Sequence, residues 1–137
     1  MNRRIMLLSI LAMSGITLSV SSVKAQSRPN STVWNSPDTS VNPLYETYAN
    51  DVPFDDLGGY ARSRYGTTAV AYMETNHAYG WKIKYRSGAV WKVIGINMLD
   101  AAQYHGRKRF GNRLKNWGCY FKNWSGTSWR GAYIVRY

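Results

Sequence analysis

Two histidines and a few charged side chains are the residues of this chain that could perform acid–base chemistry. His77 follows Glu74 by three positions, and His105 precedes Arg107 and Arg109. A ribonuclease-like reaction needs a general base, a general acid and a cation that contacts the phosphate, and these residues could supply all three. Because no catalytic motif joins them, we expect His77 to lie in a turn and His105 on the surface of a helix. A small secreted hydrolase is therefore an alternative function only.

Other kinds of catalytic or metal site have less support. Beyond residue 56 the acidic residues are Glu74 and Asp100, whereas a glycosidase needs two carboxylates across the scissile bond. Asp100 falls in the first turn of a predicted helix, where the helix dipole favours a carboxylate. Two isolated histidines and one cysteine do not have the spacing of metal ligands. We predict no catalytic residues, no metal site and no cofactor.

Cys119 is the single cysteine, so the chain cannot form an internal disulfide. Its neighbours Trp117 and Phe121 are aromatic, which predicts a buried thiol that behaves as a small apolar side chain. The alternative is a reactive thiol activated by the nearby cations of Lys115 and Lys122.

The segment WKIKYR (81–86) alternates strictly between apolar and basic residues, as a half-buried strand does. We expect the apolar side chains to point into a core: Trp81, Ile83 and Tyr85. We expect the cations to form a row on the opposite face: Lys82, Lys84 and Arg86.

Further cations and aromatic residues extend the candidate binding surface. A domain of about 80 residues cannot bury all of its large aromatic side chains, so some should lie exposed beside the cations. Cations at a helix end or on an edge strand can also be purely structural. We predict a ligand-binding set of nine residues: Lys82, Lys84, Arg86, Trp91, Arg107, Arg109, Trp124, Trp129 and Arg130.

The N-terminal segment has the features of a secretory signal peptide. Arg3 and Arg4 precede a short apolar stretch, and small residues precede Gln26. We expect cleavage after Ala25, export to a secreted or periplasmic location, and no stable transmembrane anchor. Residues 26–53 are rich in Ser, Pro and Asn without a helical or strand period, and they predict an extended or partly disordered arm.

Charge separates this arm from the domain that follows. Residues 26–56 contain one basic and five acidic residues, whereas residues 57–137 contain 14 basic and two acidic residues. Such segregation favours an anionic partner for the second part. The acidic arm could also fold over the basic surface and shield it.

Residues 54–137 predict a helix, three strands, a second helix and two strands. The expected ranges are 57–65, 69–74, 79–86, 89–96, 98–110, 113–122 and 128–137. The hexapeptides SGAVWK (87–92) and SGTSWR (125–130) match in residue type, and each helix ends in an aromatic residue followed by Gly. We predict a single small α+β domain with an aromatic-rich core, built from two related units at about 54–96 and 97–137.

The order and spacing of four segments resemble a two-unit module of bacterial exported and sensor-linked proteins: LGGYA (57–61), AYGWKI (78–83), IGINMLDAA (94–102) and NWGC (116–119). In that module a helix cysteine pairs with a Trp-x-Cys cysteine in each unit. The matching positions here are Ala61 with Ile83, and Ala102 with Cys119. The resemblance covers about residues 54–122. It implies that packing replaces both cross-links, and it implies a fold rather than an activity.

The sequence therefore predicts an exported, non-catalytic binding module for an anionic ligand, most simply an envelope glycan or polymer. An acidic protein partner is a further possibility, and nucleic acid would bind without specificity. The alternatives are the secreted hydrolase and a cationic membrane-active protein.

Overall fold

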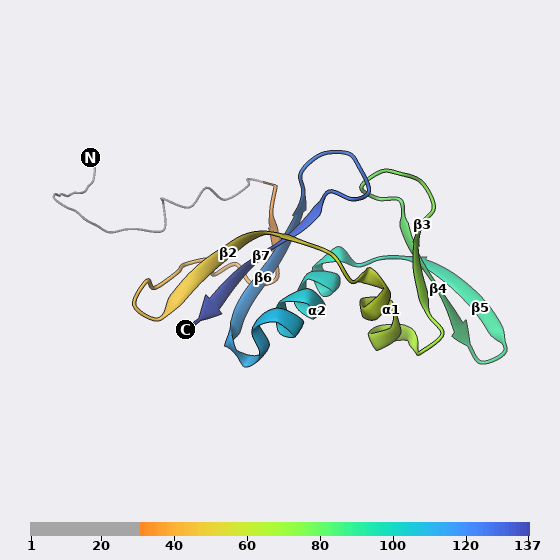
Figure 1. The fold of residues 1–137 in the computed structure, drawn as a ribbon, viewed down its shortest axis with the longest axis horizontal. Coiled ribbons are helices and arrows are strands. Elements are labelled where there is room, and N and C mark those ends of the chain that lie inside the picture. Colours follow the sequence, from red (N-terminus) through yellow and green to blue (C-terminus); the bar gives the residue numbers. More distant parts are fainter. Residues whose placement is uncertain (1–30) are drawn as a thin grey trace.

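The computed structural model describes residues 31–137, which form two helices and seven strands arranged in two antiparallel sheets (Figure 1). The expected signal peptide and residues 26–30 of the expected arm lie outside the described residues. No helix within residues 31–137 is both long enough and apolar enough to cross a membrane.

The larger sheet has four strands in the order β1-β6-β7-β2. These strands are β1 (Val33–Trp34), β2 (Glu46–Pro53), β6 (Leu114–Phe121) and β7 (Trp129–Arg136). Helix α2 (Met98–Phe110) covers one face, and a short 3-10 turn (Gly111–Arg113) connects it to β6. A second apolar cluster centred on Tyr48, Tyr120 and Ile134 covers the other face.

The smaller sheet has three strands in the order β3-β4-β5: β3 (Val70–Met73), β4 (Trp81–Ser87) and β5 (Val90–Gly95). Helix α1 (Leu57–Tyr65) packs against β3 and β4, between this sheet and α2 (Figure 1). The predicted ranges of both helices are confirmed. The predicted strands of residues 54–137 are also present, with ends that differ by one or two residues.

Local capping explains why the helix ends could be predicted. The side chains of Asp56 and Asn97 accept hydrogen bonds from the first-turn amides of α1 and α2. The helices end at Gly66 and Gly111, whose φ angles of 106° and 59° favour glycine.

Residues 46–53 differ from the expectation of an irregular arm, because they form strand β2 and pair with β7 along most of its length. The ladder shifts register between Ala49 and Val52, and Asp51 within this bulge has a φ of 58°. Because the bulge interrupts the two-residue repeat of a strand, the segment ETYANDVP (46–53) does not alternate regularly between apolar and polar residues. With seven strands and two helices the domain is mostly sheet, so the α+β description fits only loosely.

One core cluster extends across α1, α2 and both sheets, and it contains Tyr60, Ile83, Trp129 and Tyr133. Aromatic side chains contribute much of its area, as expected for a small domain without disulfides. The Cys119 thiol is 4% exposed, and burial raises its pKa to about 12. The predicted burial of Cys119 is therefore confirmed.

Candidate anion-binding site

Strand β4 presents its apolar and basic side chains to opposite faces, as the alternation predicted. Ile83 is fully buried under α1, and Trp81 and Tyr85 are half-buried beside it. Lys84 and Arg86 are exposed on the opposite face. Lys82, at the start of the same row, is half-buried.

Trp91 lies on the same face as this row. The register of β4 and β5 places Arg86 opposite Trp91, and antiparallel partners share a face of the sheet. Lys84 Nζ lies 5.2 Å from the centroid of the Trp91 ring, and Arg86 Cζ lies 5.3 Å from it. The indole, which is 46% exposed, therefore holds both cations by cation–π attraction. We call Lys82, Lys84, Arg86 and Trp91 the basic sheet face.

The neighbouring strands complete this surface with uncharged residues that the sequence did not single out. Lys84 is paired with Val70 of β3 on one side and with Val93 of β5 on the other. Both valines are more than half exposed. Tyr72 is the β3 partner of Lys82. These residues could not be predicted from the alternation within one strand, because their positions beside the cations depend on the register between strands.

None of the three cations on the basic sheet face has an ion pair with a carboxylate of residues 31–137. The cations of the larger sheet differ in this respect, because the acidic residues of β2 lie beside them. Asp51 pairs with Lys122 at 3.2 Å and with Arg130 at 3.4 Å. The acidic residues of β2 thus pair with three cations beside the larger sheet, Lys115, Lys122 and Arg130, and with no cation of the smaller sheet.

Two further predicted residues, Arg107 and Arg109, are exposed near the end of α2. The Arg107 guanidinium covers the Trp117 ring at 5.6 Å and donates to the carbonyl of Gly111 at 3.4 Å. This end of α2 and β5 lie on opposite sides of α1 (Figure 1). The two arginines therefore do not extend the basic sheet face.

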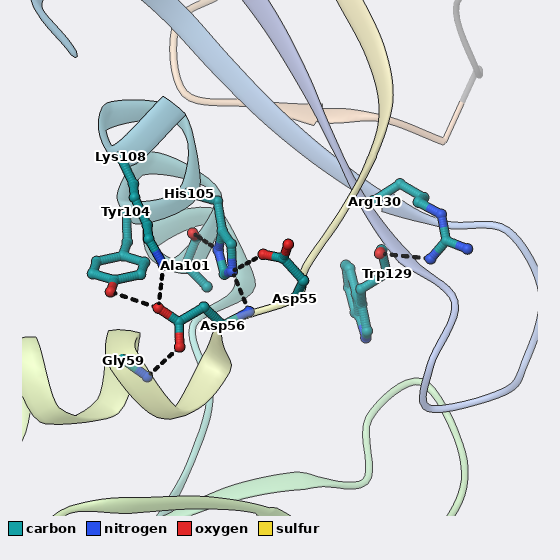
Figure 2. A network of polar contacts seen from close by, with 9 residues as sticks. All are labelled: Asp55, Asp56, Gly59, Ala101, Tyr104, His105, Lys108, Trp129 and Arg130. Carbon is teal, nitrogen blue, oxygen red and sulfur yellow. Dashed lines mark hydrogen bonds and ion pairs between the residues drawn. The ribbon is translucent and has the colours of Figure 1, made fainter. Parts of the chain in front are cut away.

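Trp129 does not lie exposed beside the cations, as the sequence led us to expect, because its side chain is 8% exposed. Its indole N–H donates to the carbonyl of Ala78 at 2.6 Å. Arg130 donates to the carbonyl of Trp129 at 2.9 Å (Figure 2) and pairs with Asp51. Trp124 is 55% exposed in the β6–β7 loop and stacks on the His77 ring at 5.1 Å.

The expectation that His105 lies on the surface is also wrong, because its side chain is 4% exposed. Figure 2 shows the ring beside Asp55 and Asp56, at the start of α1. The backbone N–H of Asp56 donates to His105 Nε2 at 3.0 Å, so His105 Nδ1–H donates to the carbonyl of Ala101 at 2.7 Å. The ring also stacks on Phe54 at 4.8 Å. Burial lowers the pKa of His105 from its usual 6.5. The 3.9 Å approach of Asp55 is therefore a contact with a neutral imidazole.

Asp56 connects the two helices beside this histidine (Figure 2). Its carboxylate accepts hydrogen bonds from Lys108 at 2.6 Å, from the Tyr104 hydroxyl at 3.0 Å and from the Gly59 amide at 2.9 Å. The bond from Lys108 does most to lower the pKa of Asp56 to about 2. A carboxylate that stays ionised and fully bonded is a structural cap rather than a general acid.

His77 is fixed in a similar way within the β3–β4 loop. The backbone N–H of Tyr79 donates to His77 Nδ1 at 3.2 Å, which leaves Nε2–H to donate to the Thr75 hydroxyl at 2.9 Å. Both histidines thus have both ring nitrogens engaged. Among residues 31–137 there is also no cluster of His, Cys, Asp or Glu that could hold a metal ion.

No protein-family model, curated protein or solved structure matches the chain. The likeness to the two-unit module stays a prediction.

Proposed function

We propose that this chain is an exported, non-catalytic binding module for an anionic ligand, and that the basic sheet face is its binding site. The observation that carries the proposal is the gathering of Lys82, Lys84 and Arg86 beside exposed Trp91, with no carboxylate partner among the described residues. Cations that are not neutralised within the protein are available to an external anion.

The spacing of the cations favours a polymer over a small ion. Side chains on the same face of a strand repeat about every 7 Å, so the row spans about 14 Å. A flat row of this length matches an extended chain with regularly repeated negative charges. An acidic envelope glycan or polymer has this character, and the predicted signal peptide would bring the protein to it.

We also infer that the two units of the domain are related by duplication. In each unit the aromatic residue before the terminal glycine of the helix packs on the following hairpin: Tyr65 on Tyr85 at 4.8 Å, and Phe110 on Tyr133 at 5.6 Å. Strand β1 lies beside β6 as β3 lies beside β4. Residues 33–34 thus take the position of the strand that the second unit lacks.

The test compares two triple variants of the purified protein with equal loss of charge. K82Q/K84Q/R86Q removes the row, whereas R62Q/K92Q/R136Q removes three exposed cations outside it. Binding to acidic polysaccharides and to single-stranded DNA is measured across a salt series. We expect the first variant to lose about tenfold to hundredfold in affinity for its best polymer, and the second to stay within about threefold. Equal losses would mean that only net charge matters.

A second candidate is the surface of an anionic bilayer, and the exposed valines favour it. Val70 and Val93 flank Lys84, and Val90 is exposed near the tip of the hairpin. Apolar side chains among cations suit a lipid interface. If the protein co-sediments with vesicles that contain anionic lipid and releases an entrapped dye, the ligand is a membrane surface rather than a polymer.

A further inference from the structure

A hollow with aromatic walls lies where the two sheets meet, at the start of β4 and the end of β5. Its volume is about 220 Å³, and Tyr79, Trp81 and Trp129 form its walls. Ile96 and Met98 also line it.

Hydrogen bonds fix the two indole rings, so the cavity is already formed without a ligand. The Trp81 indole N–H donates to the carbonyl of Gly126 at 2.7 Å, and the Trp129 indole N–H donates to the carbonyl of Ala78 at 2.6 Å. Each tryptophan of one sheet is thus held by a loop next to the other sheet. A preformed site loses little conformational entropy when it binds.

Tyr79 gives the cavity a polar group that is free to bind. Its side chain is 64% exposed, and its ring meets the Trp129 ring edge-on at 6.4 Å. Its hydroxyl makes no hydrogen bond to another residue of the described chain. An amphipathic side chain of this kind can combine ring contact with hydrogen bonding.

Gly95 connects the cavity to the basic sheet face. It lines the cavity, and its Cα is paired with that of Lys82 across β4 and β5, a separation of about 5 Å. A Cβ added to Gly95 would have no neighbouring atom within 4 Å. The added Cβ would stand on the Lys82 side of the sheet, because cross-strand partners share a face, whereas the Trp81 wall of the cavity belongs to the opposite face. A ligand in the cavity would therefore reach the basic sheet face around the edge strand β5 at Gly95.

We propose that this cavity is a subsite for one sugar ring of an acidic polysaccharide whose charged groups lie along the basic sheet face. The volume is below the usual 300–1,000 Å³ of a drug-sized site, and it suits a single six-membered ring. The aromatic walls fit the C–H face of the ring, and the Tyr79 hydroxyl fits one of its hydroxyl groups. This subsite rests on the proposed function, and it distinguishes a glycan from a linear polyphosphate.

The test uses alginate as the acidic polysaccharide and inorganic polyphosphate as a ring-free polyanion. Gly95→Leu places a side chain beside Lys82, on the path around the edge of β5, without a clash, and Tyr79→Ala removes one wall of the cavity. Ser87→Leu adds the same side chain at the far, exposed end of β4 and serves as the control. We expect both cavity variants to lose about tenfold in alginate affinity and to stay within about twofold for polyphosphate. The control should change neither affinity.

The outcomes separate this subsite from the proposed function. If K82Q/K84Q/R86Q weakens both polymers while Gly95→Leu and Tyr79→Ala change neither, the basic sheet face stands and the subsite is wrong. If the triple variant changes neither polymer, or if the protein binds neither, both proposals are wrong. If the cavity variants lose single-stranded DNA instead of alginate, the cavity holds a nucleobase and the sugar proposal is overturned. Because Gly95 is exposed, its variant remains informative even if Tyr79→Ala fails to fold.

Discussion

At the scale of single residues, His105 and Cys119 are the two reactive side chains that the fold places in its interior. Each was a candidate for chemistry because of its type. His105 instead provides one acceptor and one donor to backbone groups, which joins α2 to the start of α1. Buried polar groups are kept in this way when every hydrogen bond is satisfied.

The depressed pKa of His105 predicts a loss of stability in mild acid. Protonation would place a donor on Nε2 against the donating N–H of Asp56, so the folded state binds the proton less well than the unfolded state. Its contribution is complete above pH 6.5, the usual pKa, and decreases as the pH falls below it. We expect the free energy of unfolding to fall by at most about 1.4 kcal/mol per pH unit there.

Urea unfolding of wild type and His105→Gln between pH 5 and 8 measures this effect. The variant should be less stable at neutral pH but should have a flatter pH profile. Asp56 does not interfere, because its pKa of about 2 places its effect in stronger acid. Parallel profiles for the two proteins would show that His105 does not set the pH dependence.

The buried thiol of Cys119 predicts very slow chemical modification in the folded state. Its pKa of about 12 leaves almost no thiolate at neutral pH, and the thiolate is the reactive species. An aromatic disulfide reagent should label it only after denaturant is added, as followed by absorbance. Rapid stoichiometric labelling in buffer would contradict the buried position.

At the scale of elements, the helices and hairpins of residues 54–137 could be predicted because their signals are local. Asp56 and Asn97 cap the helices, terminal glycines end them, and the alternation in β4 determines which side chains are buried. Strand β2 could not be predicted, because its bulge at Asp51 removes the periodicity and its stability comes from pairing with β7, about 80 residues away. The positions of Trp129 and His105 were missed for the same reason, since their burial depends on long-range packing.

A substitution in β2 tests whether this strand is part of the core. Tyr48 is 6% exposed and packs on Tyr120 and Ile134, whereas Tyr45, just before the strand, is 66% exposed. We expect Tyr48→Ala to lower the free energy of unfolding by about 3–5 kcal/mol. Tyr45→Ala, the matched control, should change it by less than about 0.5 kcal/mol. Denaturant midpoints that agree for the two variants would mean that β2 is dispensable.

At the scale of the whole molecule, the distribution of charge matters more than its total. The acidic residues of β2 lie beside cations of β6 and β7, with Glu46 paired to Lys115 at 2.8 Å and Asp51 paired to two further cations. The expectation of an acidic arm that folds over the basic surface is therefore wrong for residues 46–53, which are a strand of the larger sheet. The cations of the smaller sheet have no ion pair within residues 31–137, so under the proposed function we expect a polyanion to bind at that end of the molecule.

Asp51→Asn tests this arrangement, because it releases Lys122 and Arg130 while keeping the size of the side chain. Asn also tolerates the positive φ of 58° at this position. We expect affinity for a polyanion at low salt to rise about two- to fivefold, because a second cationic area becomes available. At moderate salt the increase should vanish, since screening removes exposed, weakly organised contacts first.

Asp38→Asn adds the same charge without breaking an ion pair and is the control. An equal increase for both variants would mean that total charge governs binding, whereas an increase for Asp51→Asn that persists at moderate salt would place a binding site on the larger sheet.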